Sequence, residues 1–238
     1  MNSLSQILSS ISIMALPLLL AIVLHEYAHG WVANFFGDST AKDLGRLTMN
    51  PLRHIDPLGT ILVPAMCLLA PGNFLFGWAK PVPINSTRLH KPRRDMAFVA
   101  AAGPAMNFFL LIASAVVLSL ILAFDTSPTI QPGGESQSNL AHTILLPIAA
   151  MAQFSILINT ILMVINLIPI PPLDGGRIMT SLLPPQPALF LRQLEPYGMF
   201  IILGLIMADP YTHIIRTILM SVFQILTATI LPSELMSS

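Results

Sequence analysis

Residues 11–36 read ISIMALPLLLAIVLHEYAHGWVANFF, an apolar run that ends in a cluster of ionisable side chains. The part from Ile11 to Leu24 carries no charge and is nearly all apolar. Such a run is typical of a membrane-spanning helix, because the core of a bilayer requires about 20 apolar residues. No basic residue precedes it, so we expect a permanent span rather than a cleaved signal peptide.

The composition of the whole chain also indicates a membrane protein. Of its 238 residues, 54% are hydrophobic and only 9% are charged, whereas about 25% of the residues in a soluble domain are charged. Eleven Lys and Arg residues balance eleven Asp and Glu residues, which excludes the basic surface of a nucleic-acid binder. A single cysteine, Cys67, excludes a disulfide framework. We therefore expect an all-α polytopic membrane protein with about five to six transmembrane helices.

Other long apolar runs supply the remaining spans. We expect membrane helices over residues 4–36, 96–124, 142–168 and 211–231. A shorter run, 197–208, spans the membrane only if its helix begins near Ala188 and carries Arg192 and Glu195 at its polar end. We expect the chain to form one intramembrane domain, with boundaries at 1–238 for the domain, 4–183 for its core and 188–231 for the C-terminal helices.

The ionisable cluster at the end of the first run has the pattern H-E-x-x-H, at His25, Glu26 and His29. Positions i and i+4 of a helix share a face, so both imidazoles can reach one metal ion. Glu26 lies beside them, where a carboxylate can take a proton from a metal-bound water. Charged side chains cost ~2.5–3.5 kcal/mol each at the centre of a membrane helix, so these residues must face a polar cavity or each other. The alternative is that the histidines only bond neighbouring helices or lie at the membrane interface.

A catalytic zinc site requires a third protein ligand, and Asp174 is the best candidate. It follows the apolar run 142–168 and a proline-rich break over 169–172, and it precedes Gly175 and Gly176. Prolines end a helix, and glycines allow another backbone to approach closely. A broken helix at membrane depth is tolerated where it lines a cavity or packs on protein. The alternative role for Asp174 is to cap the helix that begins at Gly175.

Two asparagines in the apolar helices are candidate substrate-binding residues. Asn107 ends the stretch Gly103-Pro104-Ala105-Met106-Asn107, and Asn166 ends an apolar run before the proline-rich break. A buried amide requires a hydrogen-bond partner, and the main chain of a substrate is one candidate. Tight helix packing through small residues is the alternative for the Gly103 stretch. We interpret His54 as a loop histidine, with a supporting role near the site as the alternative.

Residues 58–78 are apolar but contain Pro64 and a turn signal at 71–73, so they either cross the membrane or dip in and return. The flanking segments 37–57 and 79–95 carry three and five Lys and Arg residues, and we expect short strands or loops there at one membrane face. A full crossing would place these basic segments on opposite faces, against the positive-inside rule, and would separate Asp174 from the histidines. We therefore expect a re-entrant or interfacial 58–78, with the site toward the cytoplasm.

These motifs resemble the site-2 protease family, the intramembrane zinc metalloproteases. His25-Glu26-x-x-His29 is similar to the family's zinc-binding helix. Asn166-x-x-Pro169-x-Pro171-Pro172-Leu173-Asp174-Gly175 is similar to its second signature, in which the Asp is the third ligand. Gly103-Pro104-x-x-Asn107 resembles its middle helix, and Gly77-Trp78-Ala79-Lys80-Pro81-Val82-Pro83 resembles the linker of the compact subgroup without PDZ or CBS domains.

The resemblance implies a zinc-dependent endopeptidase that hydrolyses peptide bonds in or near transmembrane segments of membrane-protein substrates. One Zn²⁺ would be held by His25, His29 and Asp174, with Glu26 as the catalytic base. Asn107 and Asn166 would hold the substrate. The alternatives are a catalytically inactive membrane scaffold or chaperone, and a metal transporter.

The expected partners are a transmembrane protein substrate and the lipid bilayer, with no nucleic acid and no organic cofactor. We expect a multi-pass protein of the bacterial inner membrane.

Overall fold

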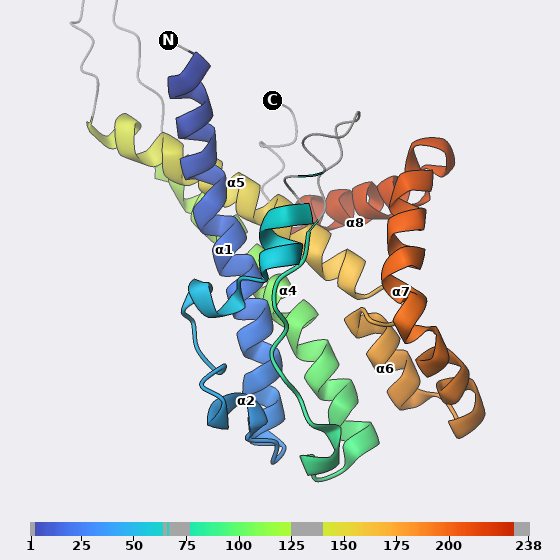
Figure 1. Cartoon of the computed structure of the whole chain (residues 1–238). Helices are drawn as coiled ribbons and strands as arrows, with labels where there is room; N and C mark the ends of the chain where they lie inside the picture. Colours follow the sequence, from blue (N-terminus) through green and yellow to red (C-terminus); the bar gives the residue numbers. More distant parts are fainter. Residues whose placement is uncertain (1–2, 64–65, 67–76, 125–139, 231–238) are drawn as a thin grey trace, which may run out of the picture. The chain divides into compact units, whose positions relative to one another are not determined.

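The computed structural model describes residues 3–63, 66, 77–124 and 140–230 (Figure 1). These residues form helices and loops, and they contain no strand. The long helices are α1 (Ser3–Phe35), α4 (Pro92–Phe124), α5 (Leu140–Asn166), α7 (Pro185–Thr212) and α8 (Ile214–Ile230). The short helices are α2 (Thr40–Asp43), η1 (Pro51–His54), η2 (Pro57–Leu62), η3 (Ser86–Arg88) and α6 (Asp174–Leu182).

Among the described helices, α1, α4, α5 and α7 are long and apolar enough to cross a membrane, and α8 is a shorter apolar helix. The expected all-α polytopic fold is confirmed. Helix α7 begins at Pro185, upstream of Ala188, so the run 197–208 is part of a candidate span over Pro185–Asp209. The run 197–208 was expected to span only if its helix begins near Ala188, and the structure meets this condition.

Local chemistry defines where α4 begins. Pro92 is its first residue, a position at which the fixed φ of proline suits a helix and no N–H is required. The carboxylate of Asp95, in the first turn, accepts a hydrogen bond from the main-chain N–H of Lys91 at 2.6 Å. An acidic side chain there also interacts favourably with the positive end of the helix dipole.

The helices contribute to two compact units. The first unit comprises Met1–Ala21, Asn107–Val164 and Ile206–Ser238. The second unit comprises Ile22–Met106 and Ile165–Leu205, and it contains both predicted histidine ligands and Asp174. The predicted organisation as a single domain over 1–238 stays a prediction.

In the second unit, the C-terminal end of α1 and the first turns of α4 enclose a small apolar core that contains Ala33 and Val99. Asp38, which is 1% exposed, follows α1 and accepts hydrogen bonds from the main-chain N–H groups of Thr40 and Asn85. This carboxylate therefore joins the polar segments 37–57 and 79–95. We expected short strands or loops in both segments. Their described residues form loops and short helices and contain no strand.

The two ends of the segment 58–78 lie side by side. The N–H of Trp78 donates to the carbonyl of Gly59 at 3.0 Å, and the Thr60 hydroxyl donates to the carbonyl of Trp78 at 2.9 Å. The choice between a crossing and a re-entrant segment falls mostly on residues 64–65 and 67–76, which lie outside the described residues. Adjacent ends are nevertheless what a re-entrant or interfacial segment requires, since a full crossing would separate them.

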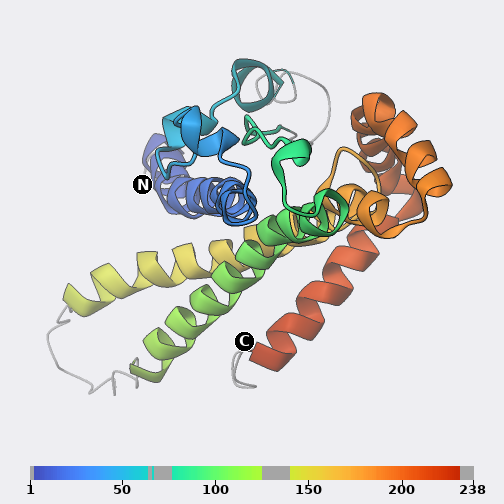
Figure 2. The same cartoon turned by 90° about the horizontal axis from the view of Figure 1, so that it is seen from below.

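In the first unit, α4 and α5 run side by side over an apolar core (Figures 1 and 2). A buried polar network joins them. The amide nitrogen of Asn107 donates to Asn159 Oδ1 at 2.9 Å and to the carbonyl of Ala21, in α1, at 3.3 Å. Asn159 in turn donates to the carbonyl of Ser155 at 2.8 Å, and Ser114 Oγ donates to Ser155 Oγ at 2.7 Å. These bonds fix the register of three helices.

Replacing Asn159 by Leu is expected to lower the free energy of unfolding in detergent by about 1–2 kcal/mol. One interhelical hydrogen bond in a membrane protein contributes roughly 0.6 kcal/mol on average, and the variant also leaves the Asn107 amide without this acceptor. Equilibrium unfolding measures the change. As a control, Thr229→Val removes an exposed hydroxyl that donates to Ile225 within α8, and it should have little effect. An unchanged unfolding free energy for Asn159→Leu would show that the network does not stabilise the bundle.

Candidate metal centre

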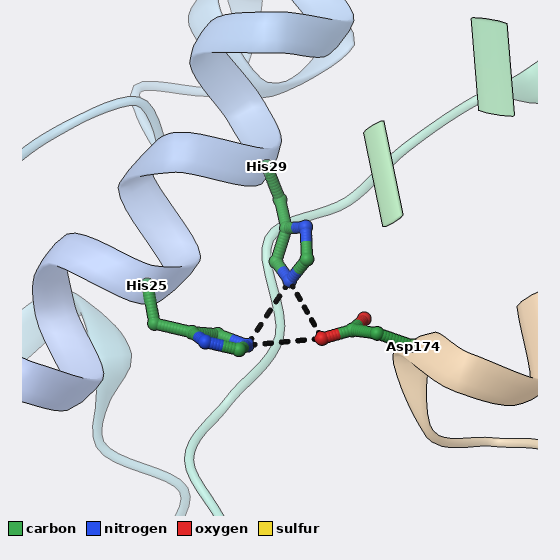
Figure 3. Close-up of side chains that lie close together, drawn as sticks. All are labelled: His25, His29 and Asp174. Carbon is green, nitrogen blue, oxygen red and sulfur yellow. Dashed lines mark hydrogen bonds and ion pairs between the residues drawn. The ribbon is translucent and has the colours of Figure 1, made fainter. Parts of the chain in front are cut away.

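His25 and His29 lie on one face of α1, four residues apart (Figure 3). Both side chains are buried, with relative exposures of 7% and 5%. Their Nε2 atoms are 3.1 Å apart. The helical spacing of the H-E-x-x-H pattern is sufficient to bring the two imidazoles together.

Asp174 is the first residue of α6 and completes the cluster. Its Oδ2 atom lies 3.2 Å from His25 Nε2 and 3.3 Å from His29 Nε2 (Figure 3). The residue is 6% exposed. All three side chains that the sequence analysis selected as metal ligands therefore meet in the second unit, and together they could hold one metal ion.

The geometry of the cluster fits zinc. Tetrahedral Zn²⁺ with bonds of about 2.0–2.1 Å requires ligand atoms about 3.3–3.4 Å apart, close to the separations found here. Asp174 Oδ2 is buried, and no donor among the described residues forms a well-aligned hydrogen bond to it. Buried polar atoms nearly always have a partner, and a cation would provide one. Two imidazoles and one carboxylate would leave the fourth position open, as in catalytic zinc sites.

The ligands are also in the chemical form that a metal requires. His29 Nδ1 lies 2.7 Å from the carbonyl of Val99, which can only accept, so Nδ1 donates, and in the neutral imidazole Nε2 then carries the lone pair that binds a metal. Burial by itself would raise the pKa of Asp174. Hydrogen bonding and charge interaction with His25 and His29, when these imidazoles are protonated, outweigh burial and hold the pKa of Asp174 below its ordinary value. The carboxyl group is therefore ionised.

Gly103 of α4 faces the two imidazoles. A Cβ at this position would lie 2.6 Å from His25 Nε2 and closer still to His29 Nε2, distances that real Cβ atoms essentially never show. Glycine alone leaves room here for both rings. Tight helix packing is the role expected of this small residue from the sequence, and in the structure it also leaves room for the two imidazoles of α1.

Glu26 is half-buried, and its carboxylate is held by a main-chain donor. The N–H of Val82 donates to Glu26 Oε2 at 2.8 Å. The side chain of Val82 is itself buried against α1, where a Cβ on Gly30 would lie 3.0 Å from its Cγ1 atom. The close approach of Val82 to α1 therefore orients the carboxylate of Glu26.

The segment 79–83, which contains Val82, is also held by two residues of the segment 37–57. The N–H of Lys80 donates to the carbonyl of His54 at 2.9 Å. Arg46 Nη2 donates to the carbonyls of Lys80 at 3.1 Å and Pro81 at 3.3 Å. A guanidinium with two acceptors on consecutive residues holds the main chain in place. The position of Val82 thus depends on the polar segment 37–57.

The sequence profile of peptidase family M50, the site-2 protease family, matches residues 13–207. The chain belongs to family M50. YwhC of Bacillus subtilis strain 168, a candidate zinc metalloprotease, is 35% identical over 206 residues, which cover 83% of this chain and 81% of YwhC. Candidate zinc metalloproteases named Rip2 from Mycolicibacterium smegmatis and Mycobacterium tuberculosis H37Rv are each 27% identical. Those matches cover 79% and 80% of this chain and 64% of each relative. No solved structure matches the chain.

This M50 protein is a zinc metalloprotease and a multi-pass membrane protein. The three clustered side chains, which could hold one metal ion, lie within the matched region, and the geometry around them suits zinc. The predictions of family, enzyme class and zinc cofactor are therefore confirmed. The roles of individual side chains in metal binding, catalysis and substrate binding stay predictions.

The remaining predicted site residues lie outside the ligand cluster. Asn107 belongs to the first unit and is fully buried in its polar network. Asn166 ends α5 in the second unit and is partly exposed. His54 is the last residue of the short helix η1, is 3% exposed and donates from Nε2 to the carbonyl of Thr48 at 2.9 Å. Val99 and Val82 cannot be identified from the sequence, because both act through main-chain atoms, which do not depend on residue type.

Replacing Gly103 by Ala is expected to weaken zinc binding by at least tenfold. The added methyl group would occupy the space of the imidazoles and force one or both out of position, and outer-shell changes in zinc sites already cost about 10- to 100-fold in affinity. Competition with a chelating indicator measures the affinity. Ala105→Val adds more volume to α4 at an exposed position and serves as the control. Equal affinities for the two variants would contradict the proposed role of Gly103.

Proposed function

We propose that this M50 protein is an endopeptidase that hydrolyses peptide bonds in or near the transmembrane segments of membrane-protein substrates. The observation that carries the proposal is the position of the ligands. His25 and His29 lie within α1, inside a run that is long and apolar enough to cross a membrane. A protease with its metal ligands in such a helix meets its substrates within or beside the bilayer.

We assign the metal-ligand role to His25, His29 and Asp174 and the catalytic role to Glu26. When bound, zinc supplies Lewis acidity, which lowers the pKa of water toward about 7 and polarises a peptide carbonyl. The carboxylate of Glu26 takes a proton from the attacking water and then delivers it to the leaving amide nitrogen. The N–H of Val82 keeps this carboxylate in one orientation during both transfers.

A transmembrane substrate must unwind locally, because a helix hides its amides in internal hydrogen bonds. Exposed main-chain groups then require new partners. Asn107 and Asn166 are proposed to supply them. Asn107 would have to exchange its bond to Asn159 for one to the substrate.

The proposed location is a bacterial inner membrane, with the site toward the cytoplasm. Eight of the eleven Lys and Arg residues lie in the segments 37–57 and 79–95. The positive-inside rule favours the cytoplasmic side for both. Segment 79–83 contacts Glu26 directly, so the site and these basic segments belong to the same side. The relatives that match the chain come from bacteria.

The deciding experiment uses the purified protein in proteoliposomes with a co-reconstituted single-span substrate. We expect about one zinc per chain, as for a single mononuclear site, with cleavage lost on metal removal and restored by added zinc. The control substrate carries the same sequence on a water-soluble carrier. Mass spectrometry of the products locates the cut.

Cleavage that survives complete metal removal would contradict zinc dependence. Cleavage restricted to the water-soluble carrier would contradict the membrane substrate class. Zinc flux into liposomes without any proteolysis would favour a transporter instead.

A further inference from the structure

Helix α7 contacts the loop 167–173, which leads directly into Asp174, the proposed third ligand. Gly198 of α7 is buried against residues 171–172. A Cβ at Gly198 would lie 2.6 Å from the carbonyl carbon of Pro171 and 2.6 Å from Pro172 Cδ, and closer still to the Pro171 oxygen. The nearest atoms belong to the backbone and a proline ring, which cannot rotate away.

The same loop packs on α6 just as closely. A Cβ at Gly176 would lie 2.5 Å from the carbonyl carbon of Ile170 and 2.7 Å from Pro171 Cα. A Cβ at Gly175 would lie 2.5 Å from the carbonyl oxygen of Ile168. The loop therefore packs against both the first turn of α6 and the middle of α7, where these glycines have no side chain to separate the backbones.

This packing determines where Asp174 lies, because Asp174 follows the loop directly and begins α6. The N–H of Leu173 donates to the carbonyl of Ile170 at 3.0 Å, so the last residues before Asp174 form a tight turn. Ligand distances in metal sites lie within about 0.2 Å of their ordinary values. A methyl group at position 198 would displace the loop, and with it the carboxylate of Asp174, by more than this distance.

The helix itself gives no reason for glycine at position 198. Glycine is the least favourable residue in a helix interior apart from proline. Gly204, six residues further along α7, serves as an internal comparison, because a Cβ added there would meet no atom within 4 Å. Of these two positions of α7, only Gly198, on the face that contacts the loop 167–173, lacks space for a side chain.

We propose that Gly198 is a positioning residue for the zinc ligand Asp174, so that α7 forms part of the metal site without touching the metal. The inference rests on the proposed role of Asp174 as the third ligand. It predicts that the methyl group of Gly198→Ala weakens zinc binding although position 198 carries no ligand atom.

The test compares Gly198→Ala, Gly204→Ala and Asp174→Ala in the full-length protein. Zinc affinity is measured by competition with a chelating indicator, and thermal unfolding is followed with and without zinc. We expect Gly198→Ala to bind zinc at least tenfold more weakly and to lose most of the zinc-dependent rise in Tm. Its metal-free Tm should also fall by about a few degrees, because the displaced loop packs less well. Gly204→Ala should match the wild type in both measurements.

Each other outcome has a defined meaning. A lower Tm in both forms, with the zinc-dependent rise preserved, would make Gly198 a packing residue and overturn the inference. Failure of Gly198→Ala to accumulate, while Asp174→Ala accumulates normally, would overturn it in the same way. Zinc binding retained in Gly198→Ala but lost in Asp174→Ala would refute this inference alone. Zinc binding retained in Asp174→Ala would refute the proposed ligand set.

Discussion

Glu26→Gln is expected to lower the rate of proteolysis by about 10⁴-fold while zinc remains bound. This is the upper end of the contribution of a positioned acid–base group, because one carboxylate serves both as base and as acid. Glutamine has the same shape, and its carbonyl oxygen can still accept the hydrogen bond from Val82. The variant therefore removes the proton acceptor and little else. Initial rates in proteoliposomes and the zinc content of the same preparation measure the two quantities.

Glu195→Gln makes the matched control, since Glu195 is an exposed acidic residue of α7. Its activity should stay within about twofold of the wild type, because surface substitutions rarely have larger effects. Cleavage at a nearly normal rate by Glu26→Gln would show that another group moves the proton. Loss of zinc from Glu26→Gln would show that Glu26 supports the ligands rather than the reaction.

The helices could be predicted well because their signals are local. The run 4–36 became α1, Ser3–Phe35, and 142–168 became α5, Leu140–Asn166. Apolar length and flanking prolines determine such boundaries within a few residues. The helix around 197–208 is harder to predict from the sequence, because Arg192 and Glu195 interrupt the apolar run while the backbone stays helical from Pro185.

The candidate metal ligands could also be predicted, because each is an ionisable residue at a position in or beside an apolar helix, where such residues are rare. H-E-x-x-H shares one helix face, and Asp174 follows a proline-rich break at the end of an apolar helix. The supporting contacts could not be predicted in this way. The carbonyl of Val99 and the N–H of Val82 are main-chain groups, and their partners lie far away in the sequence. Only the three-dimensional packing identifies them.

Asp174→Ala is expected to lower zinc affinity by more than about 100-fold, beyond the 10- to 100-fold that loss of an outer-shell partner costs. The substitution removes the ionised ligand and leaves two imidazoles, whose Nε2 atoms lie 3.2 Å and 3.3 Å from the lost oxygen. Asp174→Asn should fall between this variant and the wild type, because it keeps the shape but loses the charge. Proteolysis should fall with zinc occupancy.

Asp43→Ala is the matched control for the loss of a carboxylate. Asp43 forms an exposed ion pair with Arg88 at 3.4 Å, and such surface pairs contribute only about 0–1 kcal/mol to stability. Zinc affinity and activity of this variant should equal those of the wild type. Should Asp174→Ala bind zinc as tightly as Asp43→Ala, the carboxylate does not coordinate the metal, and the third ligand must be another residue. Zinc loss from Asp174→Ala with undiminished cleavage would instead contradict the zinc dependence of the reaction.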